Sequence, residues 1–131
     1  MAILVNVKES VEVKQGVHKG EITDVKMETR GDAGYTYVDV HVTVDDEKKS
    51  DGTPLTIKKG FPATISLKSG LGKVIQDFGC TKAELEKNTG KSIDVQKYLR
   101  KGAKVEYMTK NVKSEGGGQF AEIVEDTFKP V

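Results

Sequence analysis

The stretch GYTYVDVHVTVD, residues 34–45, decides the fold class, because two kinds of side chain alternate along it. A period of two is typical of a β-strand with one buried face. The residues expected to face the core are Thr36, Val38, Val40, Val42 and Val44. The residues expected on the outer face are Tyr35, Tyr37, Asp39, His41, Thr43 and Asp45. Two tyrosines and a histidine on that face form either ordinary cross-strand pairs or a surface on which a ligand stacks.

The segments on either side of this strand also have the sequence features of strands. In residues 16–30 the apolar period of two breaks after Ile22, which predicts a β-bulge at the next two residues. Gly20 in the same segment predicts a bend or a close backbone approach. Residues 54–67 begin as a third strand, and Pro62 marks their second half as an edge or a bent segment. The first two strands are expected to form a hairpin.

The pattern changes to that of helices after the third strand. Residues 69–80 carry apolar side chains at positions i, i+3, i+4 and i+7, which predicts one amphipathic helix. Ser69 is its expected N-cap and Gly79 its expected stop. Thr81 and Glu84 form the pattern of a capping box that opens a second short helix.

The rest of the chain completes a mainly β architecture. Residues 92–102 are expected to re-enter the sheet or to hold a helical turn around Val95, Tyr98 and Leu99. Residues 103–113 are expected to form a fourth strand and 120–131 a fifth. Three strands, a helical segment and two further strands follow the order of a five-stranded OB-fold barrel. An open five-stranded sheet with a packed helix gives the same order. We expect a single domain over 1–131, with an OB-fold core at 16–130 and an N-terminal strand or arm at 1–15.

Composition narrows the function classes. The chain has 131 residues and a formal net charge of +1, so a nucleic-acid surface would have to come from local clusters of lysine. No apolar run approaches the length of a membrane span, and the N-terminus lacks the basic lead of a signal peptide. A single cysteine, Cys80, excludes an intrachain disulfide and favours a reducing, cytoplasmic location. We expect no membrane association.

Motifs for catalysis, metals and cofactors are absent from the sequence. SGLGK, residues 69–73, resembles part of a phosphate loop, but Leu67 and Val74 occupy positions that the loop needs as Gly and as Ser or Thr. His18, His41 and Cys80 do not make a zinc ligand set. We therefore expect no enzyme, no metal and no small-molecule cofactor.

Aromatic side chains interleaved with lysines on strands are the remaining signal. This combination binds single-stranded nucleic acid, because bases stack on rings while lysines contact phosphates. The rings expected to stack are Tyr35, Tyr37 and Phe61. The expected phosphate contacts are Lys19, Lys26, Lys58, Lys59 and Lys110. Tyr107, Phe120 and Phe128 are more often core residues in such a pattern.

The chain as a whole resembles the small phage-type single-stranded-DNA-binding proteins and their uncharacterised phage and prophage relatives. The segments that carry the resemblance are GVHKGEITDVK, YVDVHVTV, SGLGKVIQDFG, GKSIDVQKYLRKGAKVEY and FAEIVEDTFKP. The resemblance covers residues 16–130 and implies an OB barrel that binds single-stranded DNA. The third strand departs from it, because LTIKKGF has lysines where those proteins usually carry an aromatic residue near the centre.

The sequence thus predicts binding of single-stranded DNA, or RNA, without sequence preference. A homo-oligomer is compatible with this prediction. The alternative is a non-enzymatic protein-interaction or structural accessory module of phage or plasmid type. The near-zero net charge favours this alternative, because small barrels also recruit partner proteins along exposed strand edges.

Overall fold

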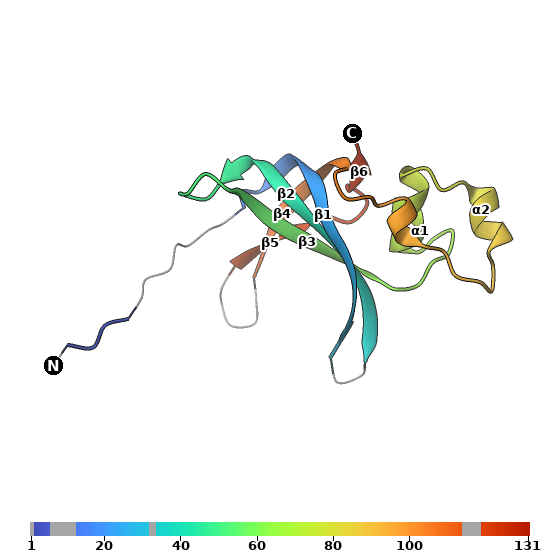
Figure 1. Ribbon diagram of the computed structural model, residues 1–131, viewed down its shortest axis with the longest axis horizontal. Coiled ribbons are helices and arrows are strands. Elements are labelled where there is room, and N and C mark those ends of the chain that lie inside the picture. The colour runs from blue at the N-terminus through green and yellow to red at the C-terminus, as the bar shows by residue number, and fades with distance from the viewer. Residues whose placement is uncertain (1, 6–12, 32–33, 114–118) are drawn as a thin grey trace.

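The computed structural model describes residues 2–5, 13–31, 34–113 and 119–131, and shows a mainly β protein with a small helical block at one end (Figure 1). The strands are β1 Gly16–Arg30, β2 Tyr35–Lys48, β3 Pro54–Pro62, β4 Lys104–Lys113, β5 Gln119–Ile123 and β6 Lys129–Pro130. The helices are α1 Gly70–Asp77, α2 Lys82–Lys87 and the single 3-10 turn η1 Val95–Lys97. The mainly β class is therefore confirmed.

All strand pairings are antiparallel, and they follow the path β3-β2-β1-β4-β5, with β6 added to β4. The sheet curls so that β3 and β5, the two ends of the path, lie next to each other. Among the described residues no backbone pairing joins these two strands, so the sheet is not closed.

β1 bends sharply and pairs with two different strands along its length. Its first part, Gly16–Glu21, pairs with β4, and its second part, from Ile22 onward, pairs with β2. The register shifts between Ile22 and Asp24, which confirms the predicted bulge. A Cβ atom on Gly20 would lie 1.9 Å from the carbonyl oxygen of Thr43, so the predicted close backbone approach is also confirmed.

The core lies inside the curled sheet and beneath the helical block. Phe128, near the C-terminus, lies among three other aromatic rings of this core. Its ring centroid is 6.5 Å from that of Phe61, 5.7 Å from that of Phe78 and 6.3 Å from that of Tyr107. α1 packs on β3 and β6 and buries its apolar stripe there. The valines at 38, 40, 42 and 44 are all buried, as their alternation predicted.

Both helices begin where their caps predicted. The Ser69 side chain accepts a hydrogen bond from the backbone N–H of Gly72, at 3.0 Å, and Thr81 accepts one from Glu84, at 3.1 Å. These bonds satisfy backbone donors that the first turn of a helix leaves without partners. Gly79 follows α1 with a φ of 108°, in the region that favours glycine. Cys80 is buried beside it.

Several boundaries differ from the prediction. The fifth strand is not continuous over 120–131, because a turn with Asp126 at a φ of 63° separates β5 from β6. The third strand ends at Pro62, and residues 92–102 hold η1 and loops instead of re-entering the sheet. The predicted N-terminal strand or arm falls largely on residues 6–12, outside the described residues, while 2–5 have no regular structure. No helix in the described ranges has the length and apolar character needed to span a membrane.

Candidate nucleic-acid interface

The two tyrosines that prompted the stacking prediction share the outer face of the β1–β2 hairpin. Tyr35 is 68% exposed, and Tyr37 is half-buried two positions further along the strand. In the register Tyr37 lies opposite Glu28 of β1 on one side and Pro62 of β3 on the other. The face thus presents one open ring and one partly covered ring, about 7 Å apart along the strand.

Two of the predicted lysines share this outer face. Lys26 lies opposite Asp39, and Lys58 lies opposite His41. The Nζ atom of Lys26 is 3.4 Å from an Asp24 carboxylate oxygen, and Lys101 lies 3.8 Å from the other. The pKa of Asp24 is lowered, because the hydrogen bonds it accepts and these lysines outweigh the opposing effect of desolvation. Both lysines are exposed, and Asp24 lies close enough to Lys26 to balance its charge.

Asp39 departs from the expected pattern of the outer face. It is fully buried, although the alternation of β2 places it on the outer face, between half-buried Tyr37 and His41. Its neighbours in the register are Lys26 and Gly60. The middle of the face is consequently closed, and His41 beside it is half-buried. Tyr35, at the hairpin end of the face, and Lys58, opposite His41, are exposed on either side of this closed part.

Phe61 and Lys59 require a correction, because both side chains lie on the inner face of β3. Phe61 is 3% exposed and packs against Phe128, so its ring is not available for stacking on the surface. Lys59 is 8% exposed, and its Nζ atom lies 3.0 Å from Glu125 Oε1 and 5.8 Å from the Phe61 ring centroid. The Lys59 ammonium group joins β3 to the segment after β5 and does not belong to an open phosphate-binding surface.

Lys19 and Lys110 are exposed, but on the outer face of a different part of the sheet. Lys19 lies in the first part of β1, opposite Glu106 of β4, and Lys110 lies opposite Glu122 of β5. The bulge in β1 separates this part of the sheet from the tyrosines. The structure thus brings together Tyr35, Tyr37, Lys26 and Lys58, and leaves the other predicted residues elsewhere.

Phe120 is a candidate that sequence reasoning assigned to the core. It is 51% exposed at the start of β5, opposite Val112 near the end of β4. Lys113, at the end of β4, is exposed as well. The β4–β5 hairpin and the β1–β2 hairpin extend toward the same side of the molecule, downward in Figure 1. Each hairpin therefore carries an exposed aromatic ring near its tip, Tyr35 on one and Phe120 on the other. The SEGGG stretch before Phe120 was the available signal, because it marks a hairpin tip.

A cavity of about 900 Å³ lies between the inner face of the β1–β2 hairpin and the helical block. Its apolar lining includes Val25, Met27, Val38, Leu71 and Leu85, and Met27 is 70% exposed. No local sequence pattern predicts this cavity, because segments far apart in the chain line it.

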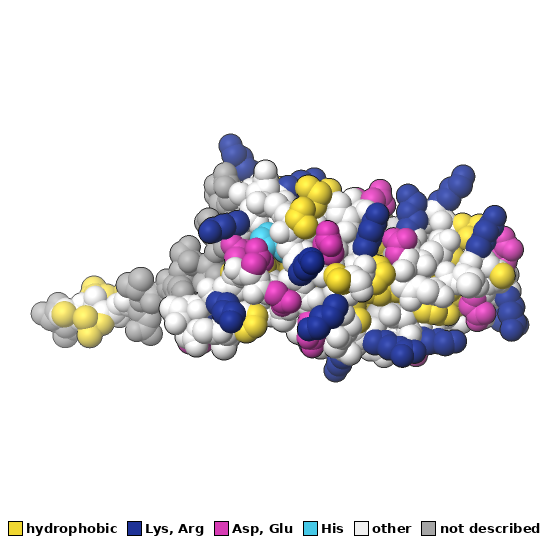
Figure 2. Space-filling view, turned by 90° about the horizontal axis from the view of Figure 1, so that it is seen from above, with side chains coloured by type: hydrophobic (Ala, Val, Ile, Leu, Met, Phe, Trp, Pro, Cys, Tyr) yellow, Lys and Arg dark blue, Asp and Glu magenta, His cyan; other side chains and the backbone are white. Residues whose placement is uncertain are grey.

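The surface around the helical block is rich in lysine. Residues 63–101 contain eight basic side chains, Lys68, Lys73, Lys82, Lys87, Lys91, Lys97, Arg100 and Lys101. They contain four acidic side chains, Asp77, Glu84, Glu86 and Asp94. Figure 2 shows dark blue side chains crowding this end of the molecule. The excess of positive charge in this segment contrasts with the near-neutral whole chain.

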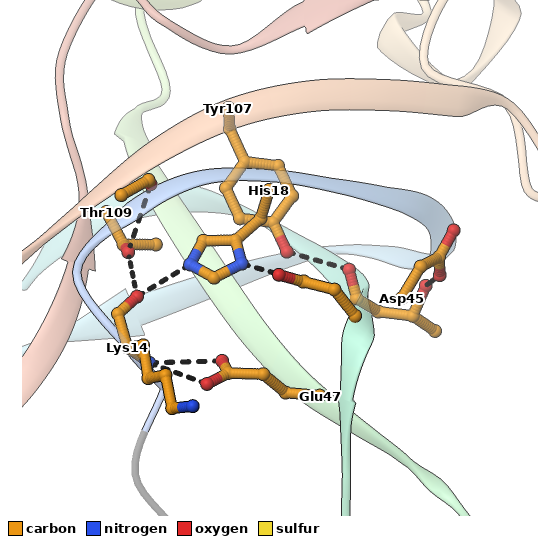
Figure 3. A network of polar contacts seen from close by, with 9 residues as sticks. Lys14, His18, Asp45, Glu47, Tyr107 and Thr109 are labelled. Carbon is orange, nitrogen blue, oxygen red and sulfur yellow. Dashed lines mark hydrogen bonds and ion pairs between the residues drawn. The ribbon is translucent and has the colours of Figure 1, made fainter.

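An extensive polar network surrounds His18, in the first part of β1 (Figure 3). The His18 ring is buried, with Nδ1 2.8 Å from Asp46 Oδ1 and Nε2 2.6 Å from the backbone carbonyl oxygen of Lys14. The Thr109 hydroxyl donates to the same carbonyl at 2.8 Å, and the N–H of Lys14 points at both oxygens of Glu47 at 3.0 Å. The network fixes the segment before β1 against β2 and β4.

Both nitrogens of the His18 ring face acceptors, which identifies the ring as an imidazolium that donates twice. Burial disfavours this charged form and is the largest single influence on the ring. The hydrogen bonds to Asp46 and Lys14, together with nearby carboxylates, outweigh it and raise the pKa of His18 above 6.5. In turn, the bond from His18 lowers the pKa of Asp46. These bonds form a structural clamp that consists of Lys14, His18, Asp46, Glu47 and Thr109.

The described residues contain no group of three or more His, Cys, Asp or Glu side chains that could hold a metal ion. A scan against models of protein families finds no match to this chain, and a search of curated proteins finds none either.

Proposed function

We propose that this chain is an OB-fold protein that binds single-stranded nucleic acid without sequence preference. The fold part of the proposal rests on the strand path β3-β2-β1-β4-β5, with β3 and β5 adjacent and α1 packed on β3 and β6. A five-stranded, partly open barrel with a helix between its third and fourth strands has this arrangement. The sharply bent β1, which pairs with both β2 and β4, also supports it.

The observation that carries the binding proposal is the pair of ring-bearing hairpins on one side of the barrel. Among the described aromatic side chains, Tyr35 and Phe120 are the two most exposed, at 68% and 51%. Exposed rings on two hairpins offer faces on which bases of any sequence stack. Tyr37 and Lys58 extend the same surface inward along β2 and β3.

The proposal can be tested by fluorescence anisotropy with a labelled oligo(dT) of about 30 nucleotides, at about 50 mM and about 300 mM salt. We expect salt-sensitive binding at micromolar concentration or tighter. Tyr35→Ala should weaken it about 5- to 100-fold, since one stacked base contributes about 1–3 kcal/mol. Phe120→Ala should weaken it by a similar factor.

Two variants control this experiment. Tyr35→Phe keeps the ring and should bind nearly as the original chain does. Met108→Ala removes an apolar side chain of comparable exposure, 43%, from the outer face of β4 and should bind normally. An absence of binding at low salt would refute the proposal, as would equal losses in Tyr35→Ala and Met108→Ala.

The second candidate function is that of a protein-interaction module, and the cavity beside the helical block favours it. An open, largely apolar cavity of about 900 Å³ is typical of ligand and peptide sites. Co-purification with one protein, together with no affinity for oligo(dT), would support this candidate over the first.

A further inference from the structure

The second part of β1 has an open edge that runs beside the cavity. β4 pairs only with Gly16–Glu21 of β1, so from Asp24 onward this strand has β2 on one side and no strand of the described chain on the other. Open edges are templates for a further strand, and proteins usually shorten, cover or charge them. Here the edge continues to the end of the hairpin.

The hydrogen bonds of Val25 show which backbone groups point toward this edge. Its N–H donates to Asp24 Oδ1 at 2.9 Å, and its carbonyl oxygen accepts from Gln96 Nε2 at 3.2 Å. Both groups therefore point away from β2. In an antiparallel ladder every second residue has the same orientation, so Met27 and Thr29 direct their N–H and C=O groups to the same side. No backbone group of the described residues pairs with them there.

The cavity adjoins this edge and accepts apolar side chains. Met27 lines both the edge and the cavity, and it is 70% exposed although it lies on the same face of β1 as buried Val25. Val38, opposite Met27, and Leu71 of α1 form part of the wall. A strand added along Met27–Thr29 would direct alternate side chains into this space.

The chain itself contains a segment of the matching chemistry. Ile3, Leu4 and Val5 are 90%, 92% and 81% exposed, and two of the three are β-branched residues that favour strands. Figure 2 shows apolar side chains in yellow at the end of the molecule opposite the helical block, where Figure 1 marks the N-terminus. Three consecutive exposed apolar residues are a site of association.

We propose that residues 2–5 of one copy add as a strand to the open edge of β1 in a second copy and place apolar side chains in its cavity. The chain after this segment is fixed at Lys14, just before β1, whereas the open edge lies near the end of the same long strand. This separation favours a second copy over the same chain. Reciprocal exchange of two such segments closes a two-fold dimer, which leaves Tyr35 and Tyr37 on the opposite face of the hairpin uncovered.

The test combines light scattering with NMR of ¹³C-methyl methionine, using the full chain. Between about 10 µM and about 1 mM protein, the mass should rise from 14.3 kDa toward twice that value, as expected for a small interface. Over the same range the Met27 methyl signal should shift, whereas the Met108 signal, from the outer face of β4, should not. The double variant Ile3→Asp/Leu4→Asp should remain monomeric with an unshifted Met27 signal.

A second variant tests the edge directly. Met27→Pro removes an N–H that faces the open edge, which a strand tolerates there, and it should also remain monomeric. A constant monomer mass with a constant Met27 signal would overturn the inference. The Met27 signal could instead differ between the original chain and the double variant by the same amount at every concentration. That result would mean that residues 2–5 bind the edge of their own chain, and it would overturn the second copy as the occupant. Dimers that survive the double variant would overturn the role of residues 2–5. None of these outcomes affects the oligo(dT) experiment.

Discussion

Single residues fix the close contacts of this fold, and Gly72 in α1 provides the sharpest case. A Cβ atom at position 72 would lie 1.8 Å from the backbone carbonyl oxygen of Ser66, which leaves no room for any side chain. Gly70, two residues earlier in the same helix, would place its Cβ atom 3.7 Å from its nearest neighbours, an ordinary contact. The two glycines therefore differ in packing although they share one helix.

We expect Gly72→Ala to lower the free energy of unfolding by about 2–3 kcal/mol, because the added methyl group must displace backbone. Gly70→Ala, as the matched control, should be neutral or stabilising by up to about 1 kcal/mol, since alanine favours helix. Urea denaturation measures both values. Equal losses in the two variants would contradict this account.

His18 gives a pH dependence whose sign follows from its environment. Its pKa is raised in the folded chain, so its contribution to stability is fully present below 6.5 and is lost as the pH rises through the folded value. The pKa of Asp46 is lowered, so its contribution is present above 3.8 and is lost as the pH falls through its folded value. The clamp is therefore strongest between these two ordinary values.

We expect the free energy of unfolding to fall as the pH rises from about 6 to about 9, because deprotonation removes one of the two bonds that the ring donates. The NMR titration of the His18 ring should have its midpoint above 6.5. Asp46→Asn should flatten the pH dependence and lower the midpoint. A midpoint below 6.5 in the original chain would show that burial prevails over the hydrogen bonds.

At the scale of elements, the seam between β3 and β5 is held by side chains instead of a backbone ladder. Lys59 reaches from the inner face of β3 to Glu125, and its side chain is 9% exposed while that of Glu125 is 66% exposed. Because the lysine is buried and its partner is not, the two halves of this ion pair should respond differently to substitution.

Glu125→Gln should destabilise the chain by about 1–2 kcal/mol, because it leaves a buried ammonium group without its counter-charge. Lys59→Met should cost less than about 1 kcal/mol, since an apolar side chain of similar length packs beside Phe61 without needing a partner. Lys73→Met removes an exposed pair with Asp126, at 3.9 Å, and should change stability by less than about 0.5 kcal/mol. Thermal unfolding of the three variants ranks them, and a larger loss in Lys59→Met than in Glu125→Gln would reverse the argument.

The elements themselves could largely be predicted from the sequence, because their signals are local. The caps Ser69 and Thr81, the bulge after Ile22 and the close approach at Gly20 each depend on a few neighbouring residues. The same period of two that buries Leu55 also places Lys59 and Phe61 on the inner face of β3. The prediction lost this period at Gly60, although the strand continues through that residue and ends at Pro62.

The arrangement of the candidate site could not be predicted in the same way, because it depends on register between strands. Lys19 and Lys26 belong to one strand, yet the bend in β1 assigns them to different parts of the sheet. Asp39 occupies an outer-face position in the alternation of β2, so the pattern predicts that it is exposed. The register places it between Lys26 and Gly60, and it is buried there. Phe120 was expected in the core because an apolar residue in a strand is usually buried, although the glycine-rich stretch before it marks a hairpin tip.

For the whole molecule, the net charge of +1 would make the salt dependence of the proposed nucleic-acid binding a local property. Each phosphate contact to a single strand contributes about 0.7 to the slope of log affinity against log salt. Because the whole chain is nearly neutral, long-range attraction should contribute little to this slope. The slope should then be proportional to the number of lysines that contact phosphates of the bound nucleic acid. Lys58 and Lys19 are both exposed strand residues, but only Lys58 shares a face with the tyrosines.

We expect Lys58→Gln to reduce the magnitude of this slope by about 0.7 and to weaken binding at low salt. Lys19→Gln, which removes the same charge from the outer face opposite Glu106, should leave the slope unchanged. The net charge of the two variants is identical, so a difference between them reports where the strand lies and not how the whole chain is charged. Equal changes in slope would mean that binding is a diffuse attraction, and the path of nucleic acid along β2 and β3 would then be wrong.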